Sequence, residues 1–167
     1  MRTYRFEKAR TQKQRLLPWQ AMEREGLTRA ILWNSLRPEL SDWLSLVDER
    51  RALLTLAWDG DALAGAVWVL PSGLCGTVHF VMFRAWRSDR VNLGRQAVRF
   101  LFDAWPFAAL LAAYPAPYRH LDAFVEALGF SPWKERLPLA CPMPTKARPE
   151  KCADMKLALL CRGEAAG

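Results

Sequence analysis

The residues best suited to chemistry lie between an apolar segment, GTVHFVMF at residues 76–83, and an amphipathic segment that starts near residue 92. The linking stretch is rich in arginine, and Gly94 stands where the second segment begins. This order predicts a strand, a basic loop and a helix, and the N–H groups at the start of a helix attract anions. The sequence therefore predicts a phosphate or pyrophosphate seat. Its candidate residues are Arg87, Arg90, Asn92, Leu93, Gly94 and Arg95.

The whole chain has 167 residues, a length that suits one domain, residues 1–167, with a single core. Hydrophobic residues make up 51% and charged residues 25%, which is typical of a globular protein rather than a disordered one. No apolar run approaches the roughly 20 residues that span a bilayer, and the N-terminus lacks the apolar middle of a signal peptide. We therefore expect no membrane partner and a cytoplasmic location.

The four cysteines are Cys75, Cys141, Cys152 and Cys161, and they show neither a CxxC pair nor the spacing of metal ligands. The sequence therefore predicts no metal site. In the cytosol, the expected state is reduced thiols packed in strands.

The formal charge of +7 is unevenly placed along the chain. Residues 1–37 carry nine Lys or Arg against three Glu, and residues 84–99 carry five Arg against one Asp. A basic surface attracts nucleic acid, acidic membranes or polyphosphate ligands. For the first block, a solvated helix face explains the charge equally well. The second block is more specific, because its charges lie where a loop meets a helix.

The apolar pattern predicts an α/β protein with a mixed sheet and helices on both faces. Pro18 and Pro38 are each expected to open a helix, and Gly26 is expected to end the first one. The predicted strands are residues 2–6, 51–58, 62–70, 76–83, 107–114, 133–141 and 151–161. The predicted helices are residues 18–26, 38–49, 92–105 and 118–130.

Two local motifs and this order of elements resemble the GNAT-type (GCN-related) acyl-CoA N-acyltransferases. The ending EALGF, residues 126–130, is similar to the family's EKLGF, and the segment around Gly94 is similar to its Q/R-x-x-G-x-G/A motif. The likeness covers most of the chain but is partial. Asn92 stands in place of the first glycine, Asp89 in place of the Gln or Arg, and Val125 in place of the family's Tyr.

The resemblance implies a mostly antiparallel sheet of about seven strands with about four helices. Its centre would be a parallel pair, formed by the strands that contain His79 and residues 109–114, which diverge at their carboxyl ends. It also implies acetyl-CoA as co-substrate, with the pantetheine arm in the gap between these strands. The acceptor would be an amine that the sequence does not identify. A backbone N–H near Met82 or Phe83 would stabilise the oxyanion, and Tyr118 would take the position of the family's Asn.

Acyl transfer to an amine needs a base, and the only side chain of the first of these strands that titrates near neutrality is His79. A histidine satisfied within the sheet is the alternative reading. Tyr114, at the end of the second strand, is the candidate acid for the departing thiolate, and a packing role is its alternative.

Two other functions remain open beside an active acyltransferase. The altered glycine motif and Val125 also fit a catalytically inactive module of this fold that serves in binding or assembly. A nucleic-acid binder is supported only by the basic N-terminal block and the tryptophans, since no known nucleic-acid-binding motif is present. A homodimer is compatible with all three functions.

Overall fold

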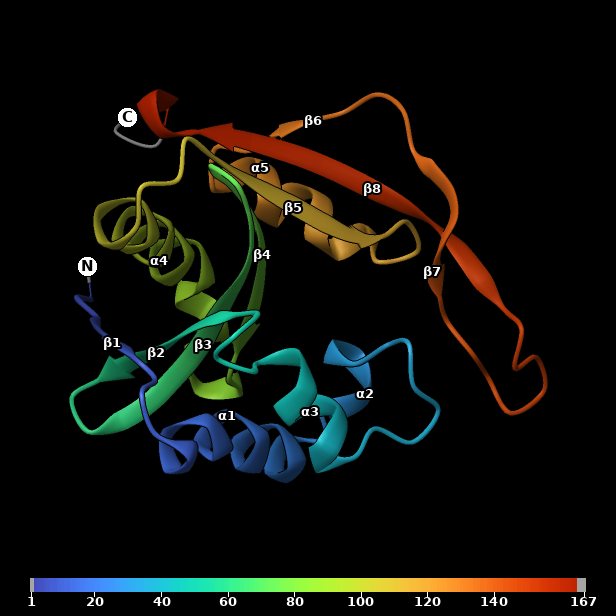
Figure 1. Cartoon of the computed structure of the whole chain (residues 1–167), viewed down its shortest axis with the longest axis horizontal. Helices are drawn as coiled ribbons and strands as arrows, with labels where there is room; N and C mark the ends of the chain where they lie inside the picture. The colour runs from blue at the N-terminus through green and yellow to red at the C-terminus, as the bar shows by residue number, and fades with distance from the viewer. Residues whose placement is uncertain (1, 165–167) are drawn as a thin grey trace.

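A single eight-stranded sheet forms the centre of the protein in the computed structural model, which describes residues 2–164 (Figure 1). The strands lie in the order β1-β2-β3-β4-β5-β8-β6, and β7 also pairs with β8. Every pairing is antiparallel except that of β4 with β5. The strands are β1 (Arg5–Lys8), β2 (Leu53–Asp59), β3 (Ala62–Ser72), β4 (Cys75–Met82), β5 (Ala109–Pro115), β6 (Ser131–Pro132), β7 (Leu137–Pro142) and β8 (Cys152–Cys161). The predicted mixed sheet with one central parallel pair is confirmed.

Residues 2–164 also form five α-helices and three short 3-10 helices. The α-helices are α1 (Gln12–Glu25), α2 (Thr28–Ile31), α3 (Leu40–Leu46), α4 (Arg90–Ala104) and α5 (Asp122–Ala127). The 3-10 helices are η1 (Arg84–Asp89), η2 (Arg119–Leu121) and η3 (Arg162–Glu164). The prediction that Pro18 opens the first helix is wrong. A capping box of Thr11 and Gln14 starts α1 six residues earlier in the chain, and Pro18 lies inside it.

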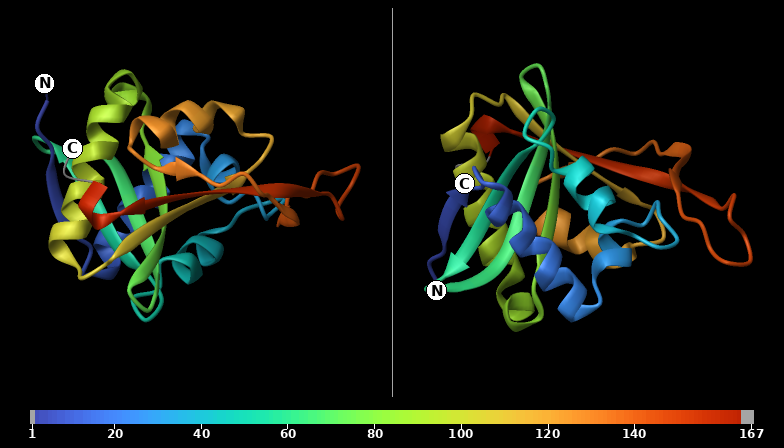
Figure 2. Two further views of the ribbon diagram at one scale, coloured as in Figure 1. Left: turned by 90° about the horizontal axis from the view of Figure 1, so that it is seen from above. Right: turned by 60° about the horizontal axis from the view of Figure 1, so that its bottom comes forward.

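Helices cover both faces of the sheet, and each face has its own core (Figure 2). Helices α4 and α5 pack on alternate residues of the strands, such as Val78 on β4 and Leu110 on β5. Helices α1 and α3 pack on the opposite residues, including Trp68 on β3 and Val81 on β4. Because successive side chains of a strand point to opposite faces, the face of each β4 residue follows from its number. His79 therefore lies on the side of α1 and α3.

Gly94 lies inside α4 rather than at its start. The 3-10 helix η1 runs directly into α4, so the helical segment begins before Asn92. A Cβ atom on Gly94 would come within 2.7 Å of Leu128 Cδ2 and 3.2 Å of Phe124 Cζ. The glycine thus allows α4 and α5 to pack closely, which the sequence pattern did not predict.

The C-terminal end of β8 is tied to the connection between α4 and β5. The guanidinium of Arg162 donates hydrogen bonds to the carbonyl oxygens of Phe102, Trp105 and Phe107, each at 2.7 Å. Arg162 therefore fixes the crossover that makes the two central strands parallel.

All four cysteines lie in strands and are free thiols, but only Cys141 is buried. The expectation of packed thiols is thus wrong for Cys75, Cys152 and Cys161. Within residues 2–164 no cluster of His, Cys, Asp or Glu is arranged to hold a metal ion. No helix in the same range is long and apolar enough to cross a membrane.

Candidate functional site

The central feature of the site is the point where β4 and β5 separate (Figure 1). Their parallel pairing runs from Cys75 opposite Ala109 to Val78 opposite Ala112. Beyond this point β4 continues along β3 as far as Met82, while β5 continues along β8 as far as Pro115. The two strands therefore diverge at their carboxyl ends, where ligands of α/β sheets commonly bind.

His79 is the first residue of β4 beyond the last paired position. It lies opposite Trp68, and the two rings stack with centroids 5.3 Å apart and planes 12° apart. Trp68 in turn meets Trp43 of α3 edge to face, with ring centroids 5.3 Å apart. The imidazole is thus one of three rings that pack together on the α1 and α3 side of the sheet, with Trp68 between His79 and Trp43.

The Nε2 atom of His79 is buried and has no hydrogen-bond partner among the described residues. Burial lowers the pKa of His79 to about 4, because the charged imidazolium would lose its hydration there. The side chain is therefore neutral at pH 7, with a ring nitrogen that is not committed to another group.

At the carboxyl end of β4, the sheet uses the N–H of Phe83, whereas the N–H of Met82 is turned away from β3. Met82 is opposite Gly65 in the sheet, and the N–H of Phe83 donates to the carbonyl oxygen of Ala64 at 3.1 Å. Phe83 is buried in the core of the α1 and α3 side, and Met82 is partly buried against the other core. The antiparallel pairing with β3 therefore continues as far as Phe83.

The segment η1 is fixed at its start and in its middle by contacts with distant parts of the chain. The N–H of Arg84 donates to the Glu25 carboxylate at 2.9 and 3.1 Å, and its Nη2 donates to the Glu25 carbonyl at 3.1 Å. The indole N–H of Trp86 donates to Asp59 at 2.9 Å. These contacts join η1 to the end of α1 and to the last residue of β2.

Asp89 ties the end of η1 to the N-terminal segment. Its carboxylate accepts hydrogen bonds from the Tyr4 hydroxyl at 2.6 Å and from Asn92 Nδ2 at 2.8 Å. These two bonds, Tyr4 first, hold the pKa of Asp89 below its usual value. Burial, and then Asp89, raise the pKa of Tyr4 to about 12. Asn92, which was a candidate phosphate ligand, thus already has an internal partner.

The remaining candidates at the start of α4 divide into two groups. Leu93 is buried, and Arg95 donates from Nε to the carbonyl oxygen of Ala127 at 2.9 Å. Arg87 and Arg90 are exposed, and neither side chain has an acidic partner within residues 2–164. The backbone N–H of Arg90 donates to the Arg87 carbonyl, so this N–H is not open to a ligand. Arg87 and Arg90 are therefore the candidate cations with no internal side-chain partner within residues 2–164, whereas Arg95 keeps its charge but commits its Nε to Ala127.

At the carboxyl end of β5, Tyr114 is buried and donates to Asp122 Oδ1 at 3.0 Å. Lys156 donates to the other oxygen of Asp122 at 2.6 Å, and it is the main cause that lowers the pKa of this carboxyl. Burial, and then the hydrogen bond to Asp122, raise the pKa of Tyr114 to about 12. Tyr114 therefore keeps its proton at neutral pH.

Tyr118 follows β5 and is turned towards the helices at the N-terminal side. Its ring meets Trp33, in the segment between α2 and α3, edge to face at 6.3 Å. Burial raises the pKa of Tyr118. Val125 is buried in the core between α5 and the sheet, so that position holds a packing residue with no proton to donate.

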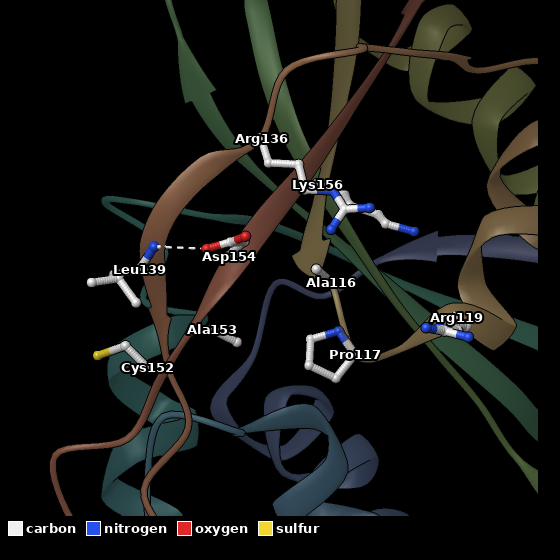
Figure 3. A pocket seen from close by; sticks show the side chains of 9 residues that line it. All are labelled: Ala116, Pro117, Arg119, Arg136, Leu139, Cys152, Ala153, Asp154 and Lys156. Carbon is white, nitrogen blue, oxygen red and sulfur yellow. Dashed lines mark hydrogen bonds between the residues drawn. The ribbon is translucent and has the colours of Figure 1, made fainter.

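Sequence reasoning missed a cavity of about 530 Å³ beyond the end of β5 (Figure 3). Arg119, Arg136, Asp154 and Lys156 are the charged residues of its lining. They come from η2, from the chain before β7 and from β8, and are spread over nearly forty residues. No local motif could have indicated that they share one pocket.

No family model matches the sequence, and no curated protein matches it either. Solved structures match over nearly the whole chain. The spermidine N-acetyltransferase from Vibrio cholerae, in complex with CoA and spermine, is 10% identical with a TM-score of 0.73 and covers 98% of both chains. A microcin C7 self-immunity acetyltransferase, in complex with acetyl-CoA and AMP, is 10% identical with a TM-score of 0.68, covering 93% of this chain and 92% of that one.

A third structure carries the name of the family that the sequence motifs resemble. It is a protein described as of the GNAT family from Desulfovibrio desulfuricans, 17% identical with a TM-score of 0.69, which covers 95% of this chain and 99% of that one. At these identities the likeness concerns the backbone. The diverging parallel pair, the order of strands and the helices on both faces agree with it, and this chain has the fold of the GNAT acetyltransferases.

Proposed function

We propose that the protein is an N-acetyltransferase that uses acetyl-CoA and an amine acceptor. The observation that carries this proposal is the separation of β4 from β5 just after Val78 and Ala112, within a fold shared with structures that contain CoA or acetyl-CoA. A divergent parallel pair offers a slot for the pantetheine arm and brings a thioester to the end of β4.

The chemistry asks little of the protein. The acceptor amine loses a proton and attacks the thioester carbonyl, a tetrahedral oxyanion forms, and the CoA thiolate leaves and takes up a proton. His79 is our candidate base, because it lies at the point of divergence and its Nε2 atom has no internal partner. Its lowered pKa makes it a weak base, so it would act best on an amine that binds already neutral.

The candidate acid is Tyr114, and the proposed coenzyme contacts remain near the start of α4. Tyr114 holds its proton at neutral pH, but it donates that proton to Asp122. For the pyrophosphate, Arg87 and Arg90 are the contacts that we favour within the candidate set, because both side chains are exposed. Tyr118 and the Met82–Phe83 segment would line the slot on either side.

A catalytically inactive module of the same fold is the second candidate. Two observations favour it: Asn92 bonds to Asp89, and Val125 is a core residue. Such a module would keep the coenzyme slot, or the fold alone, without transferring an acyl group.

Two measurements test the proposal in sequence. Titration calorimetry with acetyl-CoA and with CoA asks whether the coenzyme binds, and binding should weaken as salt is added. A thiol-release assay with a panel of amines, including polyamines, amino acids and peptide N-termini, then asks whether it reacts. Binding without thiol release for any amine would favour the inactive module. Absence of binding at millimolar acetyl-CoA would overturn the acetyltransferase and leave a module that keeps the fold alone.

The test of His79 measures the rate of acyl transfer and the affinity for CoA separately. His79→Ala should lower the rate of acyl transfer by about 10²-fold or more, as expected for loss of a general base, while the affinity for CoA stays close to wild type. A variant with the rate and pH profile of the wild type would remove His79 from the mechanism and leave the amine's own ionisation as the source of its free base.

A further inference from the structure

The cavity beyond the end of β5 gathers more positive than negative charge. Three cationic side chains, Arg119, Arg136 and Lys156, share the lining with one carboxylate, Asp154. Figure 3 shows Arg136 and Lys156 extending the same way, towards the side from which Arg119 comes. Like charges repel when they are brought together, so such a group is most stable with an anion between its members.

The two arginines have no ion-pair partner within the described part of the chain, although Arg136 is near enough to Asp122 to help lower the pKa of that carboxyl. Neither Arg119 nor Arg136 makes an ion pair or a side-chain hydrogen bond in residues 2–164. Lys156 differs, because its ammonium is 2.6 Å from Asp122, which also accepts from Tyr114. The cations of the pocket that are not in an ion pair are therefore the two arginines, whereas Lys156 is fixed by its ion pair with Asp122.

The wall opposite Arg119 is built with an unusual backbone (Figure 3). Leu139 has a φ of 53°, the only positive value for a residue other than glycine among residues 2–164. It lies where the register between β7 and β8 shifts, and its N–H donates to Asp154 Oδ1 at 3.2 Å. Local strain of this kind is often kept where a ligand site needs a particular shape. Here it turns the wall of the cavity and occupies one oxygen of its single carboxylate.

We propose that this pocket binds a small ligand through an anionic group, a phosphate or a carboxylate, held between Arg119 and Arg136. Guanidinium groups suit this role because their paired N–H donors match the oxygens of either group. The volume of about 530 Å³ lies within the range of small-molecule sites. The site is separate from the proposed coenzyme contacts at Arg87 and Arg90, and it does not depend on acyl transfer.

Inorganic phosphate and malonate are the two probes, each titrated at constant ionic strength while backbone amide signals are followed by NMR. We expect saturable shifts at Ala116, Arg119 and residues 152–156, with midpoints in the millimolar range. Preference for phosphate or for malonate distinguishes the two sources of negative charge. A separate set of shifts near residues 90–95 would report the coenzyme region, so the two sites fail or succeed independently.

Three variants test the assignment. The double variant Arg119→Gln, Arg136→Gln should weaken anion binding by about tenfold or more, since charged hydrogen bonds are lost. Asp154→Asn, which keeps an acceptor for the Leu139 N–H, should strengthen binding severalfold because it removes the only negative charge of the lining. Arg50→Gln, Arg51→Gln is the control: it removes the same charge from exposed positions between α3 and β2.

Equal weakening in the control and in the pocket double variant would mean that only the net charge matters, and it would overturn the proposal. So would shifts that rise without saturation in the wild type. Loss of binding confined to the pocket variant, with unchanged thermal unfolding of both double variants, would establish the site.

Discussion

β4 and β5 are paired over their first residues and then separate. The regions at their two carboxyl ends differ in how far their charged side chains have partners within the protein. At the end of β4 the chain enters η1, which is held by Glu25, Asp59 and, through Asp89, by Tyr4. At the end of β5 it enters η2 beside an open cavity whose two arginines have no internal partner. Both regions are basic, yet one satisfies many of its polar groups internally and the other leaves cations available. The density of charge in a sequence is therefore a poor guide to which cations can meet a ligand.

The largest expected effect tests whether the first region is built for packing. Gly94→Val should lower the free energy of unfolding by about 3 kcal/mol, because the new side chain would overlap Leu128 and Phe124. Urea denaturation measures this, with Gly163→Val as the control, since a Cβ at Gly163 meets nothing within 4 Å. If Gly94→Val were as stable as the wild type and had lost only its affinity for the coenzyme, Gly94 would be a phosphate-binding residue rather than a packing residue.

The next effect concerns His79 at the branch point and depends on pH. The folded-state pKa of about 4 is below the usual 6.5, so the unfolded chain takes up a proton first as the pH falls. Between pH 7 and pH 4.5 the wild type should lose about 2–3 kcal/mol of stability more than His79→Phe does. Denaturation curves at both pH values measure the difference. Parallel losses in the two proteins would show that the imidazole is hydrated, and accessible, in the folded state.

A matched pair of tyrosines compares the two ends directly. Tyr4→Phe removes a hydrogen bond to Asp89, and Tyr114→Phe removes one to Asp122. We expect a loss of about 1.5 kcal/mol for the first and about 1 kcal/mol for the second, since Asp122 keeps Lys156 as a charged partner. Thermal unfolding ranks the two variants. The reverse order would mean that the β5 end is the more tightly organised.

The smallest effect is a difference in CoA affinity between variants of two kinds of arginine at the carboxyl end of β4, those without an internal partner and one that has such a partner. If the coenzyme binds as proposed, Arg87→Gln, Arg90→Gln should weaken CoA binding by about fivefold, and the loss should shrink at high salt. Arg84→Gln should leave CoA affinity unchanged, because its guanidinium already donates to the Glu25 carbonyl. Calorimetry at two salt concentrations measures both. An equal loss of CoA affinity in Arg84→Gln would show that an internal partner does not decide which arginines contact the coenzyme.

The sequence predicted most elements, since strand and helix periodicity is a local property. It predicted the parallel pairing of the strands around His79 and Tyr114 and the divergence of their carboxyl ends. It did not predict that Thr11 and Gln14 start α1, which makes Pro18 an interior residue. It also predicted one helix over residues 118–130, where the structure has η2 and a short α5.

The partners of the candidate residues could not be predicted. Tyr4 and Asp89 are 85 positions apart, and Arg84 and Glu25 are 59 apart. Such contacts depend on tertiary structure that no local pattern encodes. Gly94 shows the same limit, because a glycine at a helix start suits an anion and a glycine between helices suits close packing. Only the position of Leu128 distinguishes the two.

The placement of β8 has a consequence for the order in which the molecule can be completed during synthesis. β5 lies between β4, which precedes it in the sequence, and β8, which follows it by more than thirty residues, at Cys152–Cys161. A ribosome-bound chain that has released β5 but not β8 therefore exposes a strand edge rich in Ala and Leu, a ready template for pairing with other chains. The crossover also lacks the Arg162 bonds until the same moment. Productive folding of this sheet thus awaits β8, and the yield in a cell should depend on how well the edge of β5 is shielded until then.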